Sequence, residues 1–206
     1  MNLKIHLVTG NNHKVEEIRS LADNELTVVP ISDLVGEIEV DEKGDTFLQN
    51  ALIKVETFRH LGIPLVADDS GLEIDALNGF PGVQSSRFME GRPYSEKMAE
   101  ILQRLDGEKN RKARFKCAAV FYHPSGVVLA VEGTVEGSIA YEIRGEQGFG
   151  YDPIFVPDGY DRTFGELGQE VKSIISHRAR AFKKLFSLLR LFFSNIDTEK
   201  HHKSSE

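Results

Sequence analysis

The stretch that decides the fold reads Ile63-Pro64-Leu65-Val66-Ala67-Asp68-Asp69-Ser70-Gly71. A short apolar run stops at two adjacent carboxylates, a hydroxyl and a glycine. Apolar runs of this length, bounded by turn residues, are typical of buried strands. In open α/β sheets, ligands bind just beyond the carboxyl ends of the strands. The stretch therefore predicts a strand that ends in a turn and holds Asp68 and Asp69 at a site, although an ordinary polar turn explains the same residues equally well.

The composition excludes several classes of protein. The chain has 206 residues, with 32 acidic against 25 basic side chains and a net charge of -7. This length suits one large domain or two small lobes. An acidic excess argues against a non-specific nucleic-acid binder, which normally carries a basic stripe. The only cysteine is Cys117, so neither a disulfide framework nor a thiolate metal site is expected.

Targeting signals are absent from the sequence. The N-terminus enters strand-like sequence at once, with no apolar secretory segment before it. No window approaches the ~18 apolar residues that a membrane span needs. We therefore expect a cytoplasmic protein that has neither a membrane nor a nucleic acid as its partner.

The first turn of the chain is a candidate anion site. An apolar run, Leu3 to Val8, is followed by Thr9-Gly10-Asn11-Asn12-His13-Lys14 and then by apolar residues at helical spacing. Free backbone N–H groups at a helix start bind anions, and Lys14 adds a cation where the helix dipole favours acids. The pattern favours phosphate binding over a plain capped helix start with Thr9 or Asn11 as the cap. It is not a Walker loop, because the GxxxxGK[ST] spacing is missing.

An acidic loop and a helix precede the opening stretch. Thr46, with Gln49 three residues later, forms a capping-box pattern and opens a helix. The apolar face predicted for this helix is Leu48, Ala51, Leu52, Val55 and Phe58, with Lys54 on another face. Charge runs are usually solvated, so Asp41 and Glu42 gain interest only as partners of Asp68 and Asp69 around a hard cation such as Mg²⁺.

The middle of the chain predicts a mixed sheet. Residues 72–76 alternate apolar and polar, as a half-exposed strand does. Residues 115–122 and 127–131 flank a turn and predict a β-hairpin, and a further strand is expected over 134–143. Because hairpin strands pair antiparallel, the sheet combines parallel and antiparallel strands.

Two later clusters suit a nucleotide. In Gly148-Phe149-Gly150-Tyr151-Asp152, the glycines let the backbone approach a flat ligand, and Phe149 is suited to stack on a base. A glycine-rich loop with a core phenylalanine explains the same residues. Farther on, Ser176 is the expected N-cap of a long helix, so His177 and Arg178 place cations against the helix dipole. Nearby carboxylates or an anionic ligand should compensate them, and Arg binds phosphate bidentately.

Taken in chain order, these motifs resemble the inosine triphosphate pyrophosphatase family, also called Ham1-like. The motifs that carry the resemblance are Thr9-Gly10-Asn11-x-x-Lys14, Asp68-Asp69-Ser70-Gly71, Gly148-Phe149-Gly150-Tyr151-Asp152 and Ser176-His177-Arg178. The resemblance implies a two-lobed, elongated α/β fold with a long mixed, twisted β-sheet flanked by helices. It also implies a single domain over residues 1–196 and a homodimer. The polar sequence of residues 197–206 predicts a disordered tail. The implied activity is the hydrolysis of ITP, dITP and XTP to the monophosphate and pyrophosphate, with Mg²⁺.

The same resemblance assigns roles to individual residues. Asp69 is implied as the proton acceptor, with Asp68 beside it and Lys14 as a third catalytic group. Asp69 and Glu42 are the implied metal ligands, although Lys43 stands where Thr is common in relatives and makes the match around Glu42 imperfect. The implied substrate contacts are Thr9, Gly10, Asn11, Asn12, His13, Lys14, Lys54, Ser70, Phe149, Gly150, Tyr151, Asp152, Lys172, His177 and Arg178.

Two other functions fit part of this pattern. A nucleotide-binding sensor without turnover would keep Lys14 and the Phe149 loop, but it would not need paired carboxylates at Asp68 and Asp69. A broader phosphatase or pyrophosphatase acting on canonical or pyrimidine nucleotides is not excluded by the residue types.

Overall fold

The fold is built on one mixed six-stranded sheet with the strand order β2-β1-β3-β4-β5-β6. The computed structural model describes the backbone of residues 3–203 and the side chains of residues 3–194. The strands are β1 (Leu3–Leu7), β2 (Leu26–Pro30), β3 (Leu65–Ile74), β4 (Lys112–Tyr122), β5 (Val128–Ile139) and β6 (Phe155–Pro157). β1 is parallel to β2 and β3, and the remaining neighbours are antiparallel. The predicted mixed sheet is confirmed.

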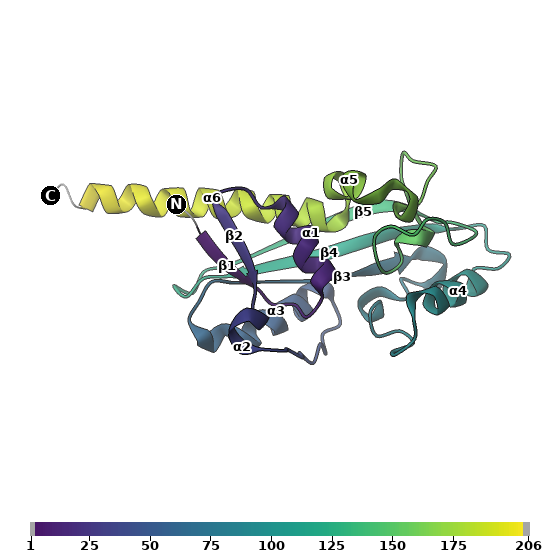
Figure 1. Ribbon diagram of the computed structural model, residues 1–206, viewed down its shortest axis with the longest axis horizontal. Helices are drawn as coiled ribbons and strands as arrows, with labels where there is room; N and C mark the ends of the chain where they lie inside the picture. The colour runs from purple at the N-terminus through teal and green to yellow at the C-terminus, as the bar shows by residue number, and fades with distance from the viewer. Residues whose placement is uncertain (1–2, 204–206) are drawn as a thin grey trace.

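Helices cover both faces of the sheet and give the molecule an elongated shape (Figure 1). They are α1 (Asn12–Leu21), α2 (Ser32–Val35), α3 (Phe47–Phe58), α4 (Tyr94–Arg104), α5 (Phe164–Ile175) and α6 (His177–Lys203). Short 3₁₀ turns occupy Arg59–Leu61, Asp75–Leu77, Gly82–Gln84 and Asp152–Ile154. In the half of the molecule that contains β1 and β2, α1 and α6 cover one sheet face and α3 covers the other. The long strands β3, β4 and β5 continue into the half that contains α4 and α5 (Figure 1).

The hydrophobic core is divided in the same way. One cluster joins β1 and the second half of β4 to α1 and α6, through residues such as Ile18, Phe121 and Phe182. A second cluster, which includes Ala51 and Val120, lies under α3. A third cluster packs Phe115 and Phe155 in the half that contains α4 and α5. This division gives the two-lobed arrangement that the resemblance implies.

The turn predicted at Asp68-Asp69-Ser70-Gly71 is wrong. β3 runs without interruption from Leu65 to Ile74 and pairs with β4 along its whole length, from Leu65↔Tyr122 to Ile74↔Ala113. The polar residues do not break the strand because β4 supplies a hydrogen-bonding partner for all of it. β5 is likewise one strand over Val128–Ile139, where two were predicted.

The β1–β3 pairing shows why the carboxylates still border a site. β1 pairs with β3 only at His6↔Leu65 and Leu7↔Val66. Beyond that point the chain leaves β1 to form the turn before α1, while β3 continues. Asp68 and Asp69 therefore lie past the carboxyl end of β1, although they lie in the middle of β3.

The buried face of α3 also differs from the prediction. Its buried residues are Phe47, Asn50, Ala51, Lys54 and Val55, whereas Leu52 is 39% exposed. These positions follow the i, i+3, i+4, i+7, i+8 spacing of a helix face. Two polar side chains, Asn50 and Lys54, therefore belong to the buried stripe and point toward the sheet.

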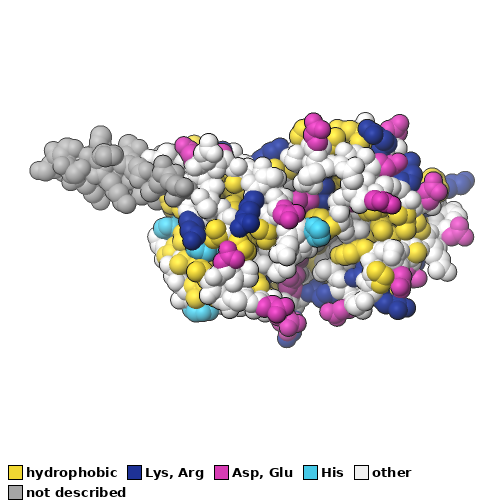
Figure 2. Space-filling model, viewed as in Figure 1, with side chains coloured by type: hydrophobic (Ala, Val, Ile, Leu, Met, Phe, Trp, Pro, Cys, Tyr) yellow, Lys and Arg dark blue, Asp and Glu magenta, His cyan; other side chains and the backbone are white. Residues whose placement is uncertain are grey.

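The last helix reaches the segment that was expected to be disordered. α6 extends to Lys203 and so overlaps residues 197–206. The side chains from residue 195 onward lie outside the described residues, and the disordered tail stays a prediction. None of the helices in the described part of the chain has the length and apolar character that a bilayer crossing requires. On the face seen in Figure 2, basic and acidic side chains are interspersed and form no continuous basic stripe.

Candidate active site

A cavity of about 320 Å³ lies between the two halves of the molecule. Its walls include the turn after β1, the loop before α3, the centre of β3, the loop before Asp152–Ile154 and the start of α6. The predicted residues that line it are Thr9, Gly10, Asn11, Lys14, Glu42, Lys54, Asp69, Ser70, Phe149, Gly150, Tyr151, Asp152, Lys172, His177 and Arg178. Asn12, His13 and Asp68 are not among the lining residues. All four predicted motifs therefore meet at one place.

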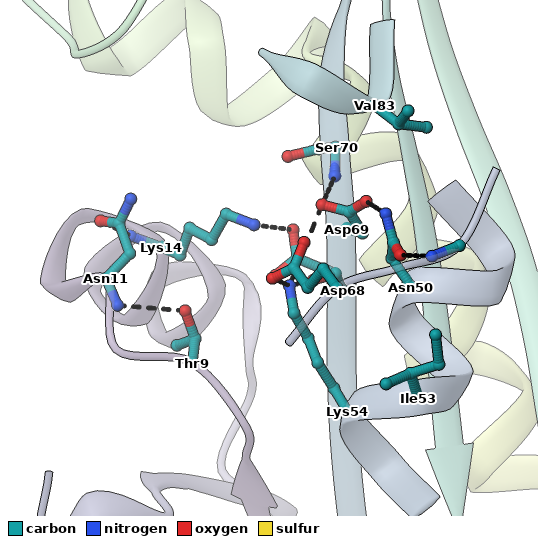
Figure 3. A network of polar contacts seen from close by, with 12 residues as sticks. Thr9, Asn11, Lys14, Asn50, Ile53, Lys54, Asp68, Asp69, Ser70 and Val83 are labelled. Carbon is teal, nitrogen blue, oxygen red and sulfur yellow. Dashed lines mark hydrogen bonds and ion pairs between the residues drawn. The ribbon is translucent and has the colours of Figure 1, made fainter. Parts of the chain in front are cut away.

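The two adjacent carboxylates point to opposite faces of the sheet. Successive residues of a strand alternate between faces, and Asp68 lies opposite Ala119 while Asp69 lies opposite Ala118. Asp68 turns toward α1 and α6, where it pairs with Lys14 and Arg178. Asp69 turns toward α3, where it accepts a hydrogen bond from Asn50 (Figure 3). The idea that the two carboxylates share one cation does not fit this arrangement.

Asp68 is a fully buried counter-ion beneath the cavity. Its Oδ2 lies 3.1 Å from Lys14 Nζ and 3.2 Å from Arg178 Nε. Burial by itself raises the pKa of Asp68, but the charges of Lys14, Arg178 and Lys54 outweigh it and hold the pKa well below the ordinary aspartate value. Asp68 is therefore ionised and fixes two cations that reach the cavity.

Asp69 lines the cavity and has a different environment. Its Oδ2 accepts from Asn50 Nδ2 at 2.9 Å, and its Oδ1 accepts from the backbone N–H of Ser70 (Figure 3). Burial raises the pKa of Asp69; Glu42 adds to the rise, while Lys54 and Lys14 oppose it. A carboxylate with raised proton affinity, held at a cavity wall, is suited to accept a proton.

Lys54 holds the acidic loop beside Asp69. Its Nζ lies 2.7 Å from Glu42 Oε1 and 3.9 Å from Asp69 Oδ1, and it donates to the backbone carbonyl of Asp68 at 2.9 Å. On the other side, Arg87 donates to the backbone carbonyl of Glu42 at 2.6 Å. Glu42 is thus fixed near Asp69 from two directions.

The start of α6 is a buried network of charges. Lys172 Nζ lies 2.6 Å from both Glu17 and Asp152, and Arg178 pairs with Glu17 and Asp68. The sequence left open whether carboxylates or a ligand compensate the cations at this helix start, and carboxylates do so. Ser176 is the predicted N-cap, because its Oγ accepts from the backbone N–H of Ala179.

Gly133 lets α6 approach the sheet closely. A Cβ at position 133 would lie 2.2 Å from the carbonyl oxygen of His177 and 2.5 Å from the backbone N of Ala181. Gly133→Ala is therefore expected to push the start of α6 away from β5. This displacement should lower the midpoint of thermal unfolding, and it should lower kcat/KM by roughly tenfold or more. Gly126→Ala, at a turn outside the cavity where a Cβ meets nothing within 4 Å but φ is 94°, should lower the midpoint through backbone strain and leave kcat/KM unchanged. Normal kinetics in Gly133→Ala would contradict this dependence of the site on close packing.

The part of the cavity around Phe149 and His177 is suited to a flat ligand. Phe149 lies 4.3 Å from Lys172 Nζ, measured to the ring centroid, and its backbone N–H donates to Asp152 at 2.8 Å. His177 stacks on Phe115 with ring centroids 4.8 Å apart, and within the described residues its Nδ1 is buried without a hydrogen-bond partner. Burial, together with Arg178 and Lys172, lowers the pKa of His177 well below the ordinary value. The imidazole is therefore neutral, with one donor and one acceptor nitrogen.

The donor set at Glu42 and Asp69 fits a Mg²⁺ ion that also binds substrate. Among residues 3–194, no group of three or more His, Cys, Asp or Glu side chains is arranged to hold a metal by itself. Mg²⁺, however, usually takes one or two carboxylates together with waters and substrate phosphates. Two carboxylates at the wall of a cavity lined by lysines meet that requirement.

Several site residues were missed by the sequence reasoning. Glu17, Asn50 and Arg87 contact the predicted residues directly. Asn50 had a usable signal, because it lies with Lys54 on the helical stripe that begins at Phe47. Glu17 and Arg87 had none, since single charged residues in a helix or loop are normally solvated.

Comparison with known proteins identifies the family of the chain. The family model described as the Ham1 family matches residues 5–188. The chain belongs to the Ham1 family. Among curated Ham1 relatives, a dITP/XTP pyrophosphatase of Exiguobacterium sp. is 43% identical over 186 residues, which cover 89% of this chain and 95% of the relative. One of Caulobacter vibrioides is 42% identical over 193 residues, covering 92% and 99%.

Solved Ham1 structures share the fold. The Staphylococcus aureus Ham1 protein superposes with a TM-score of 0.83 at 36% identity and covers 91% of this chain and 98% of its own. The nucleoside-triphosphatase / dITP/XTP pyrophosphatase of Mycobacterium abscessus gives a TM-score of 0.72 at 41% identity, covering 89% and 98%. The predicted Ham1-like family and α/β fold are confirmed, and the predicted hydrolase class agrees with the names of these relatives.

Proposed function

We propose that this protein hydrolyses the purine nucleoside triphosphates dITP, XTP and ITP to the monophosphate and pyrophosphate, and so cleanses the nucleotide pool. The observation that carries the proposal is that one cavity is lined both by groups suited to phosphates and by groups suited to a base. Lys14, Lys54, Asp69 and Glu42 are of the first kind, and Phe149, Asp152 and His177 are of the second. Relatives that are about 40% identical over most of the chain carry the name dITP/XTP pyrophosphatase.

The proposed chemical step is attack of water on the α-phosphorus, with Asp69 as the proton acceptor. Asp69 lines the cavity, and burial raises its pKa. Asp68 is less suited to this role, because it is buried beneath the cavity and its pKa is lowered. We assign Asp68 instead to positioning Lys14 and Arg178. Asp69 and Glu42 would hold Mg²⁺, which when bound polarises phosphate oxygens and acidifies a water molecule.

The leaving pyrophosphate would be stabilised by fixed cations. Lys14 is held by Asp68, and Lys54 by Glu42. Cations held in place before the reaction stabilise developing charge without reorganising during it. In the turn before α1, the backbone N–H of Thr9 donates to Leu7 and that of Asn11 donates to Thr9 Oγ1, while Asn11 caps the helix by accepting from His13 and Lys14. The positive end of the α1 dipole, more than free N–H groups, is what this turn would add near the phosphates.

Selection of the base would come from the polar groups around Phe149. A neutral His177 can donate to a keto oxygen from one ring nitrogen, and Arg178 and Lys172 supply further donors in the same cavity. Hypoxanthine and xanthine carry a 6-keto oxygen, whereas adenine carries a 6-amino group. A site rich in donors would leave donors facing donors when it bound adenine, and such mismatches discriminate strongly.

A product assay tests the proposal. The protein is incubated with Mg²⁺ and each of ITP, dITP, XTP, GTP, ATP and dTTP, and the products are separated by ion-exchange chromatography. We expect monophosphate and pyrophosphate in equal amounts from ITP, dITP and XTP, with far slower turnover of ATP and dTTP. Release of orthophosphate would instead indicate a phosphatase, and binding without product would indicate a sensor.

The other expectations for this protein rest on the family resemblance. These are Mg²⁺ as the activating ion, a homodimer and a cytoplasmic location. Repeating the assay with Mg²⁺ removed by a chelator checks the first, and light scattering after size-exclusion chromatography checks the second.

A further inference from the structure

His13 makes an aromatic contact across the mouth of the cavity. It lies in the first turn of α1, while Phe149 lies in the loop before Asp152–Ile154, in the other half of the molecule. The two rings stack with centroids 5.2 Å apart and planes inclined by 12°. Phe149 lines the cavity, but His13 does not and is exposed. His13 therefore touches Phe149 from outside the cavity.

His13, Lys172 and Arg178 approach the Phe149 ring. Its backbone is held by the N–H bond to Asp152, but this bond does not set the side-chain torsions. Lys172 and Arg178 lie 4.3 Å and 5.7 Å from the ring centroid, and ion pairs with carboxylates already hold both of them. His13 is the one aromatic ring within the described residues that stacks on Phe149. A stacked aromatic pair typically changes an equilibrium constant by roughly twofold to tenfold beyond the effect of the area that it buries.

The backbone of His13 also belongs to the turn that positions Lys14. Its backbone N–H donates to Asn11 Oδ1 at 3.0 Å, and the N–H of Lys14 donates to the same oxygen. The side chain of Lys14, the next residue, is fixed by Asp68. The first turn of α1 thus has two contacts with the proposed site. Its backbone N–H groups bind Asn11, and its His13 ring stacks on Phe149.

We infer that His13 is a positioning residue that holds Phe149 at the angle needed to stack on the purine base. The inference rests on the proposed function, in which Phe149 stacks on the base. In this arrangement the His13 side chain acts through the Phe149 ring, and not by the direct substrate contact that the family resemblance implies, because His13 does not line the cavity. It therefore contributes to affinity for the base and not to the chemical step.

Kinetics of His13→Ala test the inference. We expect the KM for XTP and dITP to rise roughly threefold to tenfold, the effect of losing one aromatic contact, while kcat stays within about twofold. His13→Phe should restore the wild-type KM, because a phenyl ring also stacks. His60→Ala replaces an exposed histidine on the Arg59–Leu61 turn, away from the cavity, and should change nothing.

A ligand without a base distinguishes an effect of His13→Ala on phosphate binding from an effect on base binding. Inorganic tripolyphosphate has the phosphates and no purine, so its inhibition constant against XTP should be the same for wild type and His13→Ala. An equal rise in both constants would overturn the inference, because His13 would then act on the phosphate turn. An unchanged KM for XTP would also overturn it. In a Phe149→Leu background, His13→Ala should add no further effect on KM.

A spectroscopic measurement keeps this inference distinct from the proposed function. The ring current of Phe149 should shift the Cε1 proton resonance of His13, and Phe149→Leu should remove that shift. This result is expected even if the protein hydrolyses none of the nucleotides tested. If Phe149→Leu left the chemical shift of the His13 Cε1 proton unchanged, the contact between the two rings would be disproved.

Discussion

Asp69→Asn is expected to abolish hydrolysis of XTP and dITP while nucleotide binding survives. The amide has nearly the same shape and can still contact Asn50, but it cannot accept a proton from water at neutral pH. Loss of a positioned general base costs about 10²–10⁴-fold in rate, and weaker binding of Mg²⁺ adds to the loss. We therefore expect kcat to fall by roughly 10³-fold or more. Steady-state kinetics with Mg²⁺ and XTP measure this.

Binding of the product shows whether Asp69→Asn removes only the chemical step or also the ability to bind a nucleotide. Calorimetric titration of Asp69→Asn with XMP, in the absence of metal, should give an affinity close to that of the wild type. Asp158→Asn changes an exposed aspartate in a surface turn and is the control for the chemical change. Turnover near the wild-type rate in Asp69→Asn would overturn the proposed mechanism.

Asp68→Asn is expected to give the largest loss of stability of any substitution described. Asp68 is fully buried, and its removal leaves Arg178 and Lys14 without their shared carboxylate. Removing one partner of a buried ion pair costs about 3–5 kcal/mol. For a chain of this length, that corresponds to a fall of roughly 10 °C in the midpoint of thermal unfolding. Calorimetry and urea unfolding measure the two quantities.

A partly exposed pair provides the matched control. Asp75 pairs with Arg114 at 2.9 Å on the solvent face of the sheet. Because water screens such pairs, Asp75→Asn should cost no more than about 1 kcal/mol. If Asp68→Asn were as mild as Asp75→Asn, the proposed counter-ion role of Asp68 would be wrong.

The penalty of Asp68→Asn should also depend on pH. The pKa of Asp68 is lower in the folded protein than in the unfolded chain, so folding favours the ionised form. The stability that Asp68 contributes is then complete above the unfolded value of about 4 and is lost as the pH falls below it. The difference in unfolding free energy between wild type and Asp68→Asn should therefore shrink below pH 4. Urea unfolding across a pH series checks this.

Much of the site could be predicted from the sequence because its motifs are local. The turn after β1, the Phe149 loop and the start of α6 each combine a backbone signal with a chemical one. The start of α6 is an example, because adjacent residues predict both the N-cap at Ser176 and the cations at 177 and 178. The mixed sheet followed in the same way from hairpin spacing.

The rest depended on long-range pairing. Nothing near Asp68 shows that β4 will pair with the whole of β3 and extend it through four polar or small residues. Without that strand, the opposite orientation of Asp68 and Asp69 cannot be derived. α5 was missed because Gly168, with φ of 76°, interrupts the helix between Phe164 and Ile175 and hides its periodicity.

The position of Arg178 has a consequence for the time at which activity arises during synthesis. Arg178 belongs to the last helix, yet its partners Asp68 and Glu17 belong to β3 and α1. Until residues 172 and 178 have been made, Asp68 pairs with Lys14 but not with Arg178, and Glu17 lacks both Lys172 and Arg178. The proposed nucleotide site is therefore complete only when α6 has left the ribosome and docked, so we expect incomplete chains to be inactive.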